Sequence, residues 1–245
     1  MTNVTEATEI GGAPVGSGAA FADLHCHTRA SFDSLAAPEA VVRAAATRGL
    51  THLAITDHDR IDGALRARDL APPGLAVIVG EEVKTAEGDL ICLFLERPIR
   101  PGMSAAETVA AAREQGGLVG IPHPFDRFRN SLLDEAGPAG PAGLVDWVEA
   151  FNARVIGRAG NERAAAFARD HGLPGVAVSD AHSVLEVAVA YSILSGDPST
   201  PAGLLAALPS ARLVRHRASY LVRGVTPLAK VIQRLRGNRR IEVVR

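Results

Sequence analysis

Short apolar runs alternate with segments of helical character from Phe21 to Asp180, and this alternation restricts the possible folds more than any other feature of the chain. Strands that alternate with helices are typical of α/β proteins with a mainly parallel sheet. The expected strands occupy residues 21–27, 51–57, 75–83, 89–95, 118–122, 144–151 and 174–180. The expected helices occupy residues 38–48, 63–70, 105–116 and 161–171.

Local signals mark the ends of several elements. Pro38 suits the first position of a helix, and Gly49 suits the position after its last residue. Ser104 and Glu107 have the spacing of a capping box, which predicts a helix start. Residues 86–89 predict a turn that joins the strands on either side into a hairpin. Residues 124–143 are rich in Pro and Gly and are predicted as a long loop, a kind of segment that is usually functional or mobile.

Polar side chains follow six of the expected strands at their carboxyl ends. His25 and His27 end the first strand, and alternation places both rings on one face with Cys26 on the other. In parallel α/β barrels the carboxyl ends of the strands share one face, where sites are built. His and carboxylate ligands without thiolate suit zinc, manganese or iron, so this face is predicted to hold several metal ions. The other strand ends supply Asp57 and His58, Glu81 and Glu82, His123, Asn152, and Asp180 and His182.

The remaining candidates for chemistry have ordinary structural roles in this interpretation. Alternation sends Glu81 and Glu82 to opposite faces, so only one of them is available as a ligand. Cys26 and Cys92 are expected to be small core residues. Three histidines match no motif and are expected at the surface or at helix ends: His52, His171 and His216.

Five motifs in order, HxH, TDH, GxE, HP and SDxH, resemble those of the polymerase-and-histidinol-phosphatase (PHP) superfamily of metal-dependent phosphoesterases. The resemblance covers about residues 21–190. It implies a distorted, TIM-like β/α barrel of seven strands, usually with three metal ions. It also selects Glu82 of the Glu81–Glu82 pair as the ligand.

The resemblance also implies a distribution of ligands among the ions. Glu82 bridges the first ion and the second, and His123 binds the second ion. Asp57 is implied to orient a ligand histidine. The implied ligands of the first ion are His25, His27, Glu82 and Asp180, and those of the third ion are Asp33, His58 and His182.

The chain departs from the family pattern at the second ion, to which many members supply another histidine. The hairpin segment that begins at Asp89 has no histidine, and the apolar run that ends at Asn152 offers only Glu149 and Asn152 itself. The second ion is therefore predicted to be weakly held, bound through water, or absent. The expected cofactor is two or three divalent ions of manganese, zinc or iron.

The expected reaction is attack on phosphorus by a metal-activated hydroxide, with Glu82 and Asp180 at the reacting centre. Arg127 and Arg129 follow the HP motif, and guanidinium groups recognise phosphate through paired hydrogen bonds. These arginines are either a phosphate clamp or solvated loop charges, and Arg154 is a weaker candidate for the same role.

The leading functional hypothesis is a phosphoric ester hydrolase (EC 3.1 class) that acts on a small phosphorylated metabolite, such as a nucleotide or a sugar phosphate. Three further functions stay open: a nuclease acting on oligonucleotides, a non-catalytic regulatory module stabilised by metal, and a C–N hydrolase. The last would use a carboxylated lysine, for which Lys84 is the only lysine outside the C-terminal segment.

The net charge of the chain is only -1, but acidic and basic residues are unevenly distributed along it. Residues 212–245 hold ten Lys or Arg and one Glu, whereas residues 1–211 hold sixteen basic and twenty-six acidic residues. We expect a disordered leader (1–19), a barrel (20–211) and a basic C-terminal extension packed on it (212–245). Within the extension, a predicted helix from Thr226 presents an apolar stripe for docking onto the barrel: Leu228, Val231, Ile232 and Leu235.

The basic extension does not make nucleic acid the favoured partner, because Tyr220 is its only aromatic residue for base stacking. The N-terminal residues lack the pattern of a secretion signal, and no run of eighteen apolar residues occurs. We therefore expect a cytoplasmic protein without membrane contact that takes a small phosphorylated substrate. The sequence leaves the oligomeric state open.

Overall fold

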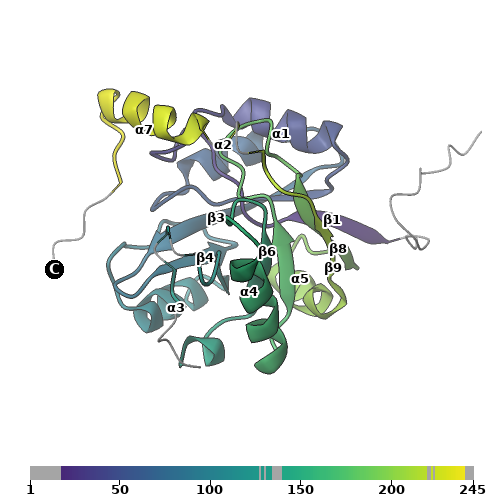
Figure 1. Cartoon of the computed structure of the whole chain (residues 1–245). Helices are drawn as coiled ribbons and strands as arrows, with labels where there is room; N and C mark the ends of the chain where they lie inside the picture. Colours follow the sequence, from purple (N-terminus) through teal and green to yellow (C-terminus); the bar gives the residue numbers. More distant parts are fainter. Residues whose placement is uncertain are drawn as a thin grey trace, which may run out of the picture.

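The computed structural model describes residues 18–126, 128–129, 131–133, 140–219, 222 and 224–240. In these residues nine strands form one sheet, in the order β7-β6-β5-β4-β3-β2-β1-β8-β9 (Figure 1). The strands are β1 (Ala19–Asp23), β2 (His52–Ile55), β3 (Ala76–Lys84), β4 (Asp89–Leu93), β5 (Leu118–Ile121), β6 (Trp147–Asn152), β7 (Gly175–Val178), β8 (Ala190–Ser195) and β9 (Arg212–Arg215).

Helices cover the outside of this sheet. In Figure 1, α7 lies near α1 and α2 at one end of the molecule, while α3, α4 and α5 lie toward the other end. The α-helices are α1 (Pro38–Thr47), α2 (Asp62–Asp69), α3 (Ala105–Arg113), α4 (Ala159–Asp170), α5 (Pro201–Ala207) and α7 (Val225–Leu235). Two short 3₁₀ helices are η1 (Gly140–Gly143) and η2 (Leu208–Ser210).

The sheet is a nearly closed barrel, because the chain after β1 meets the chain after β7. The amide of Asp180 donates to the carbonyl of His25 at 2.9 Å, and the amide of His27 donates to the carbonyl of Ala181 at 2.8 Å. These bonds bring the carboxyl ends of the first and last parallel strands to one edge. The polar residues that follow them therefore meet at one end of the barrel.

The α/β class and the expected elements up to residue 180 are confirmed, including the antiparallel β3–β4 hairpin. Ser104 accepts a hydrogen bond from the amide of Glu107, and the Glu107 side chain accepts one from the amide of Ser104, as the capping box predicts. Within the predicted loop 124–143, the structure has the 3₁₀ turn η1, and residues 127, 130 and 134–139 lie outside the described part of the chain.

Two expectations about the sheet are wrong. The described part of the sheet has nine strands rather than seven, and it is mixed rather than mainly parallel, with four parallel and four antiparallel pairings. The missed strands are β8 and β9. The sequence hides β9 because it is a four-residue edge strand that begins and ends with the exposed Arg212 and Arg215 and has no buried apolar run.

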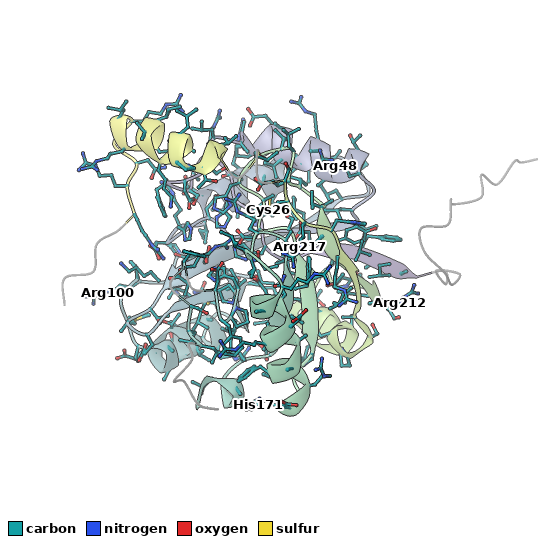
Figure 2. The ribbon with its side chains drawn as sticks, viewed as in Figure 1. Cys26, Arg48, Arg100, His171, Arg212 and Arg217 are labelled. Atoms are coloured by element: carbon teal, nitrogen blue, oxygen red, sulfur yellow. The ribbon has the colours of Figure 1, made fainter. Side chains whose placement is uncertain are left out.

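The core lies inside the barrel and between the sheet and the helices. Cys26 and Cys92 are fully buried among apolar side chains, as expected, and Figure 2 shows Cys26 in the interior. Trp147 on β6 packs against Gly120 on β5, where a Cβ atom would lie 2.1 Å from the indole ring. Gly120 therefore leaves the space that the largest buried side chain occupies.

The C-terminal helix docks with the opposite face from the predicted one. Leu228, Val231 and Leu235 have exposed fractions of 57%, 57% and 84%, whereas Ala229 and Gln233 are buried. The amide nitrogen of Gln233 lies 2.6–2.9 Å from the carbonyl oxygens of Arg29, Ser31 and Ser34. The prediction that the apolar stripe docks is therefore wrong for three of its four residues, and only Ile232 is half-buried. The helix is attached mainly by the side chain of Gln233, because an amide can satisfy carbonyl oxygens that an apolar side chain cannot.

The ends of the chain fall partly outside the structure. Residues 1–17, most of the predicted leader, lie outside the described residues. The sheet continues past residue 211, because β9 pairs with β8. Among the helices that the structure describes, none combines the length and the apolar character needed to cross a bilayer.

Candidate metal centre

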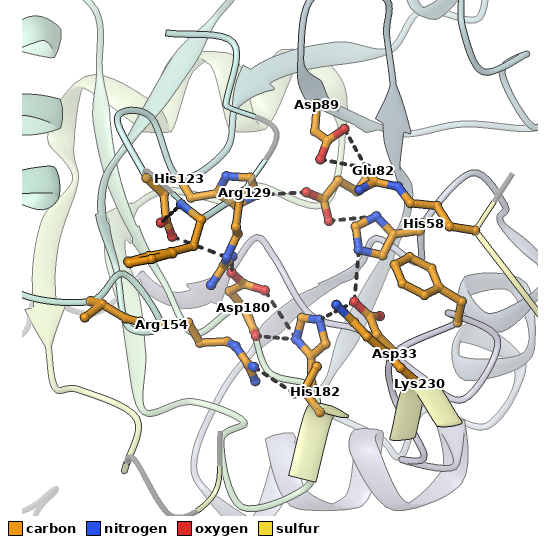
Figure 3. A pocket seen from close by; sticks show the side chains of 16 residues that line it. Asp33, His58, Glu82, Asp89, His123, Arg129, Arg154, Asp180, His182 and Lys230 are labelled. Atoms are coloured by element: carbon orange, nitrogen blue, oxygen red, sulfur yellow. Dashed lines mark hydrogen bonds and ion pairs between the residues drawn. The ribbon is translucent and has the colours of Figure 1, made fainter. Parts of the chain in front are cut away.

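Seven of the eight predicted metal ligands come from segments at the carboxyl ends of parallel strands, and Asp33 comes from the loop between β1 and α1. They gather at one end of the barrel, where six of them line a cavity of about 310 Å³ (Figure 3). The other two, His25 and His27, are fully buried next to Glu82 and Asp180. His123 and Asp180 adopt positive φ angles of 29° and 52°, which are rare for residues with side chains. Such strain is concentrated at functional sites, where the surrounding structure holds the side chain in one direction.

The first group of candidate ligands is His25, His27 and Asp180, with Glu82 beside them. The Nε2 atoms of His25 and His27 both lie 3.3 Å from Glu82 Oε2. They lie 3.6 and 3.5 Å from Asp180 Oδ1. A tetrahedral ion with bonds of about 2.0–2.1 Å has ligand-to-ligand edges of about 3.3–3.4 Å, close to these four distances. The two Nε2 atoms are only 2.9 Å apart, so a small outward shift of the rings would let the four side chains hold one ion.

The environment of one carboxylate oxygen supports this fit. Asp180 Oδ1 is buried and has no hydrogen bond among the described residues, and the imidazole nitrogens around it stay 3.4–3.6 Å away. A buried carboxylate oxygen without a partner costs free energy, which a bound cation would recover.

The second group contains Asp33, His58 and His182, with His27 nearby. Asp33 Oδ2 lies 3.4 Å from His58 Nε2 and 3.2 Å from His182 Nε2. The resemblance implied these three residues as ligands of one ion, and the structure brings them together.

The third group is Glu82, Asp89 and His123. His123 Nε2 lies 2.9 Å from Glu82 Oε1, while Glu82 Oε2 faces the first group. The sequence offers no further histidine for this position and only Glu149 and Asn152 as alternatives, whereas the structure brings Asp89 there. The hairpin contains a signal for Asp89. Glu82 pairs with Ile91 across the hairpin, and Asp89, two residues before Ile91, therefore has its side chain on the same face of the sheet as Glu82.

Glu149 and Asn152 position the ligands from β6. Glu149 Oε1 lies 2.6 Å from His25 Nδ1, and Oε2 accepts hydrogen bonds from the His123 amide and from Asn152 Nδ2. Asn152 Nδ2 also lies 2.9 Å from Asp180 Oδ2. A β-bulge between Glu149 and Phe151 explains why residues three apart on one strand both face the site.

Asp57 has a different role from the one that the resemblance implied. It accepts hydrogen bonds from the amide and the hydroxyl of Thr28 at 2.6 and 2.7 Å. Its described hydrogen bonds thus fix the chain next to His27, and Glu149 is the carboxylate that orients a ligand ring.

The electrostatics of the site favour bound positive charge. Burial by itself raises the pKa of Glu82, but His58 and His25 hold it well below its ordinary value. Burial lowers the pKa of His27, but contacts with Asp180 and Glu82 raise it to about 9. Ionised carboxylates therefore hold a proton on the His27 ring, and a divalent ion would take the place of that proton. Burial and Arg154 instead lower the pKa of His182 to about 3, so the His182 ring is neutral and ready to bind an ion.

Arginines complete the lining of the cavity. Arg129 forms an ion pair with Asp180 and lies 3.4 Å from Asp126. Arg154 binds Glu186 at 2.6 Å and Thr226 at 2.8 Å. Both arginines line the cavity, whereas Arg127 lies outside the described residues.

The remaining candidates stay away from the three groups. Glu81 points to the other face and accepts a hydrogen bond from the amide of Ile99 at 2.9 Å, and its burial raises its pKa to about 8. His52 contacts Ser199, and His171 lies at the lower edge of the molecule in Figure 2. His216 is exposed.

Comparison with known proteins identifies the family. The model of the PHP domain matches residues 23–124, and the model of a PHP-associated domain matches residues 158–213. The chain belongs to the PHP family. An uncharacterized protein of Methanocaldococcus jannaschii is 36% identical to this PHP protein over 143 residues, which cover 54% of the chain and 81% of the relative. An error-prone DNA polymerase of Mycobacterium bovis is 35% identical over 135 residues, 50% of the chain and 12% of the polymerase.

Solved structures show the same PHP fold. A two-domain protein from Bacteroides vulgatus, described as containing a predicted PHP-like metal-dependent phosphoesterase, has a TM-score of 0.69 and 19% identity; the match covers 86% of this chain and 70% of that one. A lesion-specific endonuclease from Pyrococcus furiosus has a TM-score of 0.54 and 16% identity, with 80% and 57% covered. The chain is therefore a protein of the PHP family and fold, with candidate metal-binding clusters at the expected end of the barrel.

Proposed function

We propose that this protein hydrolyses the phosphate ester of a small metabolite, such as a nucleotide or a sugar phosphate, with two or three divalent ions. One observation carries the proposal: the groups of candidate ligands open into a single cavity that four cationic side chains also line. A cavity of about 310 Å³ suits a compact ligand. The cations are Arg129, Arg154, Lys230 and Arg240.

Bound divalent ions would supply a lowered pKa for a water molecule and a charge that stabilises the phosphoryl oxygens. Glu82 has one carboxylate oxygen toward each of two ligand groups, so it is placed to bridge two ions. Asp180 would hold an ion through Oδ1, while its Oδ2 accepts hydrogen bonds from the side chains of Asn152 and Arg129. The guanidinium of Arg129 thus lies at the edge of the ligand group, where it would donate to a phosphoryl oxygen in the transition state.

The test is hydrolysis of p-nitrophenyl phosphate with manganese, zinc and iron(II) supplied separately. The double variant His25→Ala/His27→Ala should lose hydrolysis to background, because it removes two ligands of one ion. The matched control His171→Ala/His216→Ala removes two exposed rings and should keep full activity. Equal turnover by wild type and the His25→Ala/His27→Ala variant would contradict the proposal.

A nuclease is the second candidate, and basic residues of the C-terminal segment beside the cavity favour it. The endonuclease and polymerase relatives agree with this candidate, although the names describe those proteins only. A nuclease would cleave oligonucleotides better than mononucleotides and would bind them less tightly as salt rises. Affinity for DNA and RNA that does not respond to salt would count against it.

A non-catalytic module and a C–N hydrolase lead to different expectations. A non-catalytic module would contain tightly held metal, measurable by elemental analysis, and would hydrolyse no phosphate ester. A C–N hydrolase with a carboxylated lysine would need Lys84 among the ligands. The Lys84 side chain instead lines a neighbouring cavity, and it is absent from the described lining of the metal cavity.

A further inference from the structure

A second cavity, of about 370 Å³, adjoins the metal cavity. Phe32, Lys230 and Arg240 line both cavities, so the two are neighbours. No acidic residue is among the described residues that line the second cavity, and we call it the basic cavity. Its lining residues are Phe32, Lys84, Lys230, Arg234, Asn238, Arg239 and Arg240.

The cations of the basic cavity are only partly compensated. Arg240 Nη2 lies 2.7 and 2.8 Å from the two oxygens of Asp89. Lys230 Nζ lies 5.5 Å from the centre of the Phe32 ring. Across the described ranges, the structure shows no ion pair for the four cations of this cavity other than Arg240. These four are Lys84, Lys230, Arg234 and Arg239. Lys230, Arg234 and Arg239 are exposed, so water screens part of their mutual repulsion, and a bound anion would remove the part that remains.

The basic cavity has a fixed position relative to the metal ligands. Gln233 on α7 donates hydrogen bonds to the carbonyls of Ser31 and Ser34, on either side of Asp33 in the sequence. Asn238 Nδ2 lies 2.8 Å from the carbonyl of Ala30 in the same loop. Arg240 joins the cavity to Asp89 in the third ligand group. The C-terminal segment that supplies most of the cations is therefore attached to two segments that carry candidate metal ligands.

We propose that the basic cavity binds a second anionic group, a phosphate or a carboxylate, on the same small substrate whose phosphate ester lies at the metal ligands. The inference rests on the proposed function and narrows its substrate class to molecules with two separated anionic groups. The neighbouring position of the two cavities lets one compact molecule occupy both. Arg234 and Arg239 line the basic cavity and not the metal cavity, so they determine specificity without contact to the reacting group.

Binding of inorganic pyrophosphate to the full chain, measured by calorimetry in a chelator, tests the cavity without any hydrolysis. The double variant Arg234→Gln/Arg239→Gln should bind pyrophosphate about tenfold more weakly, because two charge-assisted contacts are lost. The matched variant Arg212→Gln/Arg236→Gln removes two exposed charges outside both cavities and should keep the affinity of the wild type. Equal affinities in all three proteins would overturn the proposal.

A pair of substrates tests the link to catalysis. The wild type should have a higher kcat/KM for 4-carboxyphenyl phosphate than for phenyl phosphate. In Arg234→Gln/Arg239→Gln the ratio of the two kcat/KM values should fall about tenfold, whereas the Arg212→Gln/Arg236→Gln ratio should not change. A ratio that is the same in both double variants would overturn the assignment. If the wild type hydrolyses neither ester, the proposed function fails, and pyrophosphate binding still decides whether the cavity takes an anion.

A nucleic-acid backbone offers the same phosphate chemistry. The small-substrate assignment predicts that a single-stranded oligonucleotide does not displace pyrophosphate at equal phosphate concentration. Displacement that disappears in Arg234→Gln/Arg239→Gln would assign the cavity to a polymer and overturn the assignment to a small substrate.

Discussion

At the scale of single residues, the candidate ligands depend on side chains that are not themselves in the ligand groups. Glu149 contacts the ring of one candidate ligand and the backbone of another, His25 and His123. Such hydrogen bonds fix the tautomer and the direction of a ligand ring. The sequence offers Glu149 only as a candidate for the second ion. Its role in orienting His25 is not predictable, because the bulge that turns it toward the site is not visible in the alternation of β6.

Replacing Glu149 by Gln should weaken metal binding about 10- to 100-fold, since loss of a partner that orients a ligand has that effect in known sites. Metal affinity is measured by titration with manganese or zinc under competition from a chelator. Glu162→Gln, on the exposed side of α4, is the matched control and should keep the wild-type affinity. Unchanged affinity in Glu149→Gln would show that Glu149 does not position His25.

His52 predicts a pH effect remote from the metal centre. Its pKa is lowered by burial, and Asp197 only partly opposes this. The pKa of His52 is therefore lower in the folded chain than in the unfolded chain, where it is about 6.5. As pH falls below 6.5, the unfolded chain binds the proton more readily than the folded chain, and this favours unfolding. The free energy of unfolding of wild type, relative to His52→Gln, should decrease between pH 7.5 and pH 5 in urea titrations. A constant difference between the two proteins over that range would refute this role.

At the scale of elements, close contacts between strands and helices decide what each segment tolerates. β5 and β6 are neighbours in the sheet, and Gly120 accommodates the Trp147 indole. α7 is attached through the carbonyls of the Asp33 segment rather than through its apolar stripe. Both are contacts between side chains and backbone atoms of different elements. The periodicity of a single helix or strand shows which residues share a face but does not show what that face contacts.

Gly120→Ala should destabilise the protein by about 1–3 kcal/mol, because the added methyl group overlaps the Trp147 ring. Gly143→Ala is the control, because nothing lies within 4 Å of its added Cβ and its φ angle is not positive. Chemical denaturation of both variants measures the difference. Equal stability of Gly120→Ala and wild type would mean that β5 and β6 do not pack in this way.

The orientation of α7 gives opposite expectations from sequence and structure. Leu235→Gln should change the free energy of unfolding by less than about 0.5 kcal/mol, because the side chain is exposed. Gln233→Glu should destabilise by about 1–3 kcal/mol, since a carboxylate would face three carbonyl oxygens without a donor. Hydrogen exchange of residues 29–34 should increase only in Gln233→Glu. The reverse pattern would support docking through the apolar stripe.

At the scale of the whole molecule, the candidate metal centre is also part of the barrel closure. Backbone bonds that join the ends of β1 and β7 involve His25, His27 and Asp180. Ions bound there would therefore link segments that are distant in sequence, and binding to the folded state alone stabilises it.

Removing metal should lower the thermal stability of the protein. An ion present at one hundred times its Kd contributes about 2.7 kcal/mol, which corresponds to a Tm decrease of about 5–10 °C for a chain of this size. Differential scanning calorimetry with and without EDTA measures the decrease, and adding manganese back should reverse it. A Tm that does not respond to chelation of metal-loaded protein would contradict a structural contribution of the ions.

The sequence by itself determined the order of the first strands and helices and the positions of the polar residues at their ends. These are local properties, because alternation, capping and turn signals act over a few neighbouring residues. Only the tertiary structure decided the number and direction of the strands, the place of Asp89 among the candidate ligands and the face by which α7 docks. Each of these depends on contacts between residues far apart in the chain, as between Arg240 and Asp89, and such contacts follow from the closure of the sheet rather than from local pattern.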